Sequence, residues 1–135
     1  MQLDPSAFLA EPQLIHALDA RSTPVPCESD HVLFRQGEPA AGLYILHEGV
    51  ATVSMISPDG HSLFAVQSRP GSLLGLPGLV SGQPYSLSAT AGAGSRVSFV
   101  SRNEFMALMQ TNPLLSLKIL QVLAAEVRSA RKALY

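Results

Sequence analysis

The spacing of hydrophobic residues predicts helices at the start of the chain. Leu14 and Leu18 are one helical turn apart, so they would share a face. Pro5 and Pro12 stand where the first turn of a helix tolerates proline. Residues 1–21 are therefore expected to form two short helices.

The apolar residues of 22–100 come instead in short runs separated by turn residues, a pattern typical of β-strands. Glu48-Gly49 predicts a tight reversal into the β-branched run 50–56. Residues 58–60 read Pro-Asp-Gly and predict a hairpin turn, because Asp and Gly tolerate the positive φ that such a turn needs. The predicted strands include residues 31–34, 43–46, 50–56, 61–67, 85–90 and 96–100.

The spacing becomes helical in residues 101–135. Ser101 and Glu104 form a capping-box pattern, in which a hydroxyl and a carboxylate satisfy the first free amides of a helix. Asn112-Pro113 predicts a second helix that continues without glycine or proline to the end of the chain. Its apolar positions fit a heptad stripe, so we expect this helix to pair with its twin in a homodimer. The predicted dimer interface comprises Leu117, Leu120, Leu123, Ala124, Val127 and Leu134.

Short strands followed by terminal helices indicate a mainly β fold, a jelly-roll-like β-roll or double-stranded β-helix with flanking helices. A chain of 135 residues is large enough to bury a core but too short for two domains of ordinary size. We therefore expect one domain over residues 1–135, with N-terminal helices in 1–21, the β-roll in 22–100 and C-terminal helices in 101–135.

Composition adds an expectation about partners. Apolar residues make up 47% of the chain and charged residues only 14%, below the roughly 25% usual for soluble domains. We therefore expect a partner to cover part of the surface. The formal net charge of -1 provides no field that would draw the whole molecule onto nucleic acid or anionic lipid.

Cysteine content and hydropathy bear on the cellular compartment. The single cysteine, Cys27, cannot form an internal disulfide, and the N-terminus lacks the basic and apolar regions of a signal peptide. No apolar run reaches the roughly eighteen residues that span a bilayer. We therefore expect a cytoplasmic protein without membrane association. Glu28 and Asp30 are expected to raise the pKa of the Cys27 thiol, which argues against a redox role.

Residues 70–95 contain no Asp, Glu, Lys, Arg or His but are rich in glycine and serine. Glycine lets the backbone approach a small ligand, while the missing cations leave no side chain to neutralise an anion. A neutral or apolar ligand fits this segment better than a phosphate does. Residues 75–82 could instead cradle an anion with backbone amides, or be packed shut by their own leucines. The candidate ligand pocket comprises Gly71, Leu74, Gly75, Leu76, Gly78, Tyr85, Ser86 and Ser88.

Several motifs together resemble the cyclic-nucleotide-binding domain of the Crp/Fnr regulator superfamily. In chain order they are residues 32–39, residues 42–46 with Gly49, residues 70–71 with Gly75, and residues 110–113. The resemblance implies an eight-stranded β-roll with glycines at its corners and a long last helix that pairs in a dimer. The family's DNA-reading helix-turn-helix normally follows that helix, and this chain ends at Tyr135. Direct DNA binding is therefore not expected.

The segment after Gly75 departs from the family's pattern. Members that bind cyclic nucleotides have a Glu for the ribose hydroxyl and an Arg for the cyclic phosphate there, whereas here Leu76 follows Gly75 and Tyr85-Ser86 stands near the expected Arg. Losing a buried guanidinium–phosphate pair costs about 2 to 5 kcal/mol, or roughly thirty- to several-thousand-fold in affinity. The oxygen-sensing branch holds an iron–sulfur centre with four cysteines, which one cysteine cannot supply. We expect no cofactor.

These features predict a non-catalytic sensing or regulatory domain that responds to an unidentified small effector or protein partner. The alternative is a domain that binds cyclic AMP or cyclic GMP through backbone amides and serines, and regulates transcription with a separate DNA-binding partner. An enzyme is the third reading, and the candidate pocket contains no acid, base or nucleophile pair to support it. A metal site is not expected, because His31, His47 and His61 lack the spacing that puts two imidazoles on one face.

Overall fold

The computed structural model describes residues 4–134, with side chains up to Arg131. Within this range, eight strands form two four-stranded antiparallel sheets, ordered β1-β8-β3-β6 and β2-β7-β4-β5. The strands are β1 (Thr23–Val25), β2 (His31–Phe34), β3 (Gly42–Glu48), β4 (Ala51–Ile56), β5 (Ser62–Ser68), β6 (Ser72–Leu74), β7 (Ser88–Ala91) and β8 (Arg96–Ser101). The expected β-roll with flanking helices is confirmed.

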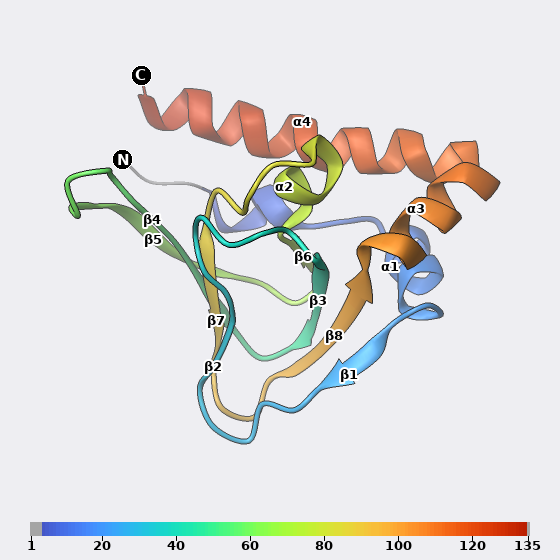
Figure 1. Cartoon of the computed structure of the whole chain (residues 1–135), viewed down its shortest axis with the longest axis horizontal. Helices are drawn as coiled ribbons and strands as arrows, with labels where there is room; N and C mark the ends of the chain where they lie inside the picture. The colour runs from blue at the N-terminus through green and yellow to red at the C-terminus, as the bar shows by residue number, and fades with distance from the viewer. Residues whose placement is uncertain (1–3, 135) are drawn as a thin grey trace.

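The helices lie at the two ends of the chain and in one connection of the roll. They are the 3-10 helix η1 (Pro5–Phe8), α1 (Pro12–Asp19), α2 (Leu76–Ser81), α3 (Arg102–Thr111) and α4 (Pro113–Leu134). The long helix α4 crosses one end of the roll, and α1 and α3 cluster beneath its first half (Figure 1). Two N-terminal helices are present as predicted, although the first is a single 3-10 turn that begins after the Asp4 cap.

Strand β3 is buried on both faces and separates two hydrophobic cores. Leu43 and Ile45 point toward the helices and pack with residues of α1, α3 and α4. Leu46 points into the roll, where Phe34 and Phe64 lie. Successive side chains of a strand alternate between faces, so a continuous apolar run is what a strand between two cores requires.

The predicted reversal at Glu48-Gly49 does not join two paired strands. Gly49 has a positive φ of 90°, and β3 and β4 lie in different sheets, so the chain crosses here from one sheet to the other. The hairpin predicted at Gly60 is present, because β4 pairs with β5 on either side of it. Short-range turn signals reveal a change of direction but not which sheet the next strand joins.

The glycine-rich stretch 75–82 is not a loop. Its centre is the helix α2, with Gly75 as the N-cap and Gly82 as the C-cap, both in the left-handed conformation. Strand β7 begins at Ser88, so Tyr85 precedes the strand rather than belonging to it. A six-residue helix with glycine at each end has too little periodicity to be recognised from sequence alone.

The C-terminal helices begin where they were predicted to begin. The Ser101 side chain accepts a hydrogen bond from the Glu104 amide at 3.2 Å, which caps α3. The Glu104 carboxylate does not complete the capping box and instead pairs with Arg21 at 3.0 Å. Helix α4 packs through Leu115, Ile119 and other buried residues into the helix-side core, the hydrophobic core between β3 and the helices α1, α3 and α4.

Candidate functional site

The structure divides the predicted pocket residues among four places. Five of them line one small cavity at the open end of the roll: Leu74, Gly75, Gly78, Tyr85 and Ser86. Leu76 is fully buried in the core beneath the helices. Gly71 borders an outer hollow beside α1, and Ser88 lines a groove on the outside of the roll. The Ser88 hydroxyl accepts a hydrogen bond from the Gln36 amide at 2.8 Å.

Tyr85 fills most of the space near Gly75. Its ring stacks on Phe34 with centroids 4.1 Å apart, and its hydroxyl donates to the Gly42 carbonyl at 2.6 Å. A Cβ on Gly75 would come within 2.8 Å of the Tyr85 ring, so only glycine leaves room for the tyrosine. The remaining cavity has a volume of about 10 Å³, which is close to the size needed for one water molecule.

The Tyr85 hydroxyl remains a neutral donor. Burial raises the pKa of Tyr85, and hydrogen bonds with Gly42 and Ala41 lower it by less. The lining of the small cavity includes no Lys or Arg, and its one acidic residue is Glu126. This chemistry offers an anion no counter-ion.

A larger cleft lies next to this cavity, under the C-terminal half of α4. It has a volume of about 230 Å³, and its walls come from η1, β4, β5, the Ser86-Leu87 segment and α4. Phe8, Met55 and Phe64 make it strongly apolar. Glu126 and Ser86 line both the cleft and the small cavity, so the two spaces adjoin.

Glu126 is the residue that the sequence reasoning missed. It continues the buried stripe of α4 formed by Leu115, Ile119 and Val122 and lies four residues after the last of them. Its Oε1 is covered from solvent and has no hydrogen-bond partner among the described residues. Burial raises the pKa of Glu126 to about 8. A single acid on an otherwise apolar helical stripe was the signal in the sequence that could have revealed it.

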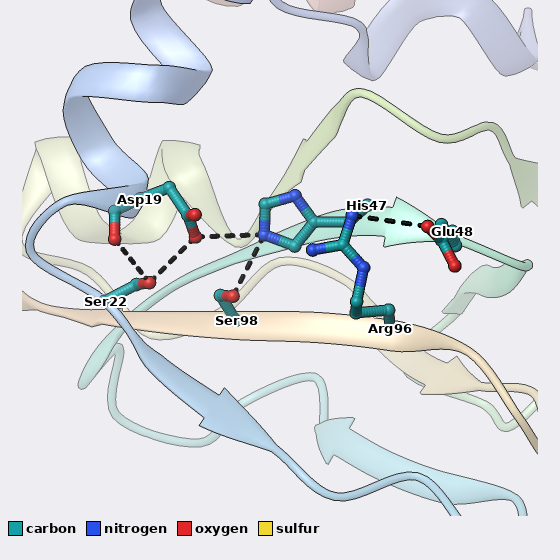
Figure 2. Close-up of polar contacts among 6 residues, drawn as sticks. All are labelled: Asp19, Ser22, His47, Glu48, Arg96 and Ser98. Carbon is teal, nitrogen blue, oxygen red and sulfur yellow. Dashed lines mark hydrogen bonds and ion pairs between the residues drawn. The ribbon is translucent and has the colours of Figure 1, made fainter.

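A polar cluster lies on the other side of the roll, where α1 ends against β3 and β8. His47 Nε2 lies 3.0 Å from Asp19 Oδ1 and 2.9 Å from Ser98 Oγ, and Ser22 donates to the same carboxylate at 2.8 Å (Figure 2). A Ser-His-Asp relay needs the acid and the hydroxyl on different ring nitrogens, whereas here both contact one nitrogen. The arrangement is not that of a hydrolase triad, and it ties α1 to the sheet.

The acid of this cluster stays ionised to low pH. Burial raises the pKa of Asp19, but hydrogen bonds from Ser22 and Ser98 and the charge of His47 outweigh it, so the pKa lies below its ordinary value. Arg96 and Glu48 form an exposed pair beside the cluster at 3.4 Å (Figure 2). An exposed pair of this kind adds little to stability.

The predicted dimer-interface residues lie mainly on the outer face of α4. Leu117, Leu120 and Val127 are each more than half exposed, and Ala124 lies exposed between them. Leu123 instead packs against the core beneath the helices. The side chain of Leu134 lies outside the described residues.

Among the described residues, Cys27 and the histidines form no further candidate site. Burial, rather than the neighbouring acids, raises the pKa of the Cys27 thiol, which corrects the reason expected from sequence. Among the side chains that the structure describes, no three His, Cys, Asp or Glu residues lie close enough to hold a metal ion. None of the helices within residues 4–134 is both long and apolar enough to cross a membrane.

An eight-stranded β-roll with a small cavity and a long helix across one end is the architecture that the sequence resemblance implied. The family model of the cyclic nucleotide-binding domain matches residues 24–112. The chain belongs to this family, as the motifs in the sequence suggested.

Two relatives by sequence and one solved structure illustrate the likeness. The CRP-like cAMP-activated global transcriptional regulator of Mycobacterium tuberculosis is 29% identical over 118 residues, covering 87% of this chain and 53% of the regulator. A cyclic nucleotide-gated potassium channel of Mesorhizobium japonicum is 31% identical over 120 residues, covering 87% of this chain and 30% of the channel. The chain thus spans about half of the first relative and under a third of the second.

The Thermus thermophilus catabolite activator protein has a similar fold. It superimposes with a TM-score of 0.79 at 21% identity, covering 97% of this chain and 62% of that protein. At this identity the likeness establishes the fold alone.

Proposed function

We propose that this chain is a non-catalytic, dimeric sensor domain of the Crp/Fnr type that does not bind cyclic nucleotides in the usual way. The observation that carries the proposal is the packing of Tyr85. It lies near the position at which the family resemblance expects the phosphate-binding Arg, and its ring and hydroxyl occupy the space beside Gly75.

The volume and charge of the small cavity support this proposal. Binding pockets for small molecules measure roughly 300–1,000 Å³, whereas the cavity at Gly75 has about 10 Å³. Its lining includes the carboxyl of Glu126 and no Lys or Arg. A cyclic phosphate placed there would meet the carboxyl of Glu126 instead of a guanidinium, so its charge would be left without a partner.

The outer face of α4 supports the dimer. Leu117, Leu120 and Val127 form an exposed apolar stripe at heptad spacing, a pattern that usually marks a helix–helix interface. Val127 also lines the 230 Å³ cleft. An effector in the cleft would therefore contact the same helix that pairs the two protomers. Effector binding would in this way change how the two α4 helices pack against each other.

Isothermal titration calorimetry with cyclic AMP and cyclic GMP tests the proposal. We expect no binding heat at micromolar nucleotide, while the cAMP-activated regulator of Mycobacterium tuberculosis, titrated in the same buffer, serves as a positive control. Saturable heat at micromolar concentration would instead support the alternative, a domain that holds cyclic nucleotides through backbone amides and serines. Ser86 is the one predicted serine that lines the small cavity and could take that role.

A further inference from the structure

The cleft under α4 contains a polar atom whose partner is missing. Glu126 Oε1 is covered from solvent and unpaired, although buried carboxyl groups are normally hydrogen-bonded or matched by a cation. The groups that line the cleft and the adjoining small cavity include one other titratable side chain, Tyr85, whose hydroxyl is already bound to Gly42. Among the described residues that line the two spaces, none carries a positive charge to match this acid.

The rest of the cleft is built to hold an apolar body. Its walls are mostly apolar and include Phe8, Met55, Phe64 and Ala130. Its volume of about 230 Å³ exceeds the ~150 Å³ of an engineered apolar cavity that takes benzene. A bicyclic aromatic group or a short branched hydrocarbon would fill it.

We propose that this cleft binds a compact apolar ligand carrying a cationic N–H donor, such as an aliphatic amine or an amidine, whose nitrogen pairs with Glu126. The proposal deepens the proposed function, on which it rests, by giving the effector a chemical class. It also explains why a carboxyl is tolerated on the buried stripe of α4: the ligand supplies the donor that the protein lacks. An anionic ligand is disfavoured, because the lining of the cleft provides no cation to match its charge.

Proton release accompanies binding in this arrangement. In the empty cleft near pH 7, burial keeps the Glu126 carboxyl protonated, since its pKa is about 8. An ammonium group favours the ionised form, so the carboxyl gives its proton to the buffer as the ion pair forms. Affinity for the amine therefore rises with pH until Glu126 is ionised in the free protein.

Three probes with the same indole ring but different charges test which class of ligand binds the cleft. Tryptamine carries an ammonium group, 3-ethylindole carries no charge, and indole-3-propionate carries a carboxylate. We expect tryptamine to bind most tightly and indole-3-propionate most weakly in calorimetric titrations at pH 7, because the carboxylate would be buried without a matching cation. The tryptamine heat should depend on the ionisation enthalpy of the buffer, which reports the released proton.

Two variants locate the binding. Glu126→Gln should weaken tryptamine by about tenfold or more and leave 3-ethylindole within about twofold, because the amide keeps the size but loses the charge. Ala130→Leu should abolish binding of both probes by filling the cleft. Glu28→Gln, a change at an exposed acid outside the cleft lining, is the matched control.

Three outcomes would overturn the inference. They are equal affinity of the wild type for tryptamine and 3-ethylindole, unchanged tryptamine affinity in Glu126→Gln, and no binding of any probe at millimolar concentration. Each leaves the proposed function standing. Tight cyclic nucleotide binding in the same calorimeter would contradict the proposed function independently of the tryptamine result.

Discussion

At the scale of single residues, Gly75 and Tyr85 decide what space remains in the roll. Gly75 has a φ of 89° and faces the Tyr85 ring at a distance that leaves no room for a Cβ. Gly60 has nearly the same φ, 88°, but a Cβ there would meet nothing within 4 Å. The two glycines thus share a backbone requirement and differ in their surroundings.

Gly75→Ala should therefore destabilise the protein more than Gly60→Ala does. Both changes place a side chain in the left-handed region, at a cost of roughly 1–2 kcal/mol. Gly75→Ala also forces Tyr85 from its place, and overpacking of a core adds about 1–3 kcal/mol. Urea unfolding of the two variants measures the difference, and equal losses would show that Tyr85 moves aside without cost.

Glu126 makes stability depend on pH in a direction unusual for an acid. Its pKa is raised from 4.5 to about 8 in the folded protein, so between these values the folded state holds a proton that the unfolded state has released. Stability is therefore greatest below pH 4.5 as far as this group is concerned, and it falls as pH rises toward 8. The slope is at most about 1.4 kcal/mol per pH unit.

Glu126→Gln should remove that slope. The variant's free energy of unfolding is expected to exceed that of the wild type by an amount that grows from pH 5 to pH 8, because glutamine has no charge to bury. Chemical denaturation at several pH values gives this difference, with Glu28→Gln as an exposed control. A constant difference across this range would mean that Glu126 titrates normally.

At the scale of elements, α4 has two apolar faces with different partners. Leu115 and Ile119 are buried against the helix-side core, whereas Leu117 and Leu120 are exposed on the opposite side. A surface helix needs one apolar stripe to pack on its own domain. The second stripe is unexplained within one protomer and is the basis for the proposed dimer.

Replacing Leu120 and Val127 by Glu should convert the protein to a monomer. Charges at two heptad positions would be buried without partners, while both side chains are more than half exposed in the isolated domain, so folding should be little affected. Sedimentation velocity at tens of micromolar measures the change, and Gln121→Glu on the same helix is the control. A wild-type monomer at that concentration would remove the dimer proposal.

At the scale of the whole molecule, the N-terminal segment closes the roll beneath α4. Phe8 is 3% exposed, belongs to the core of the roll and lines both the small cavity and the cleft. The segment η1 contacts α4 as well as β5 and β6. The first and last elements of the chain therefore share the walls of the candidate site.

Phe8→Ala should cost about 3–5 kcal/mol of stability and enlarge the cleft, because a buried aromatic leaves both a lost contact area and a void. Leu9→Ala, at a neighbouring position with 36% exposure, is expected to cost less than half as much. Urea unfolding of both variants measures the losses. Similar values would mean that the N-terminal segment is not part of the cooperative core.

The sequence by itself determined most of the elements and the family. Apolar runs bounded by turn residues located the strands, and Ser101 and Pro113 marked the helix starts, because these signals act within a few residues. The helix α2 was missed, since six residues between two glycines have no clear period. The heptad stripe on α4 was also readable, although its partner was not.

Only the tertiary structure decided which residues meet. It placed β3 and β4 in different sheets, set Tyr85 against Gly75, and brought Glu126 over the cleft next to Phe8 from the far end of the chain. These outcomes depend on long-range packing, which local propensity does not contain. The burial of Glu126 without a partner is therefore a property of the folded molecule, and it is what gives the site its proposed chemistry.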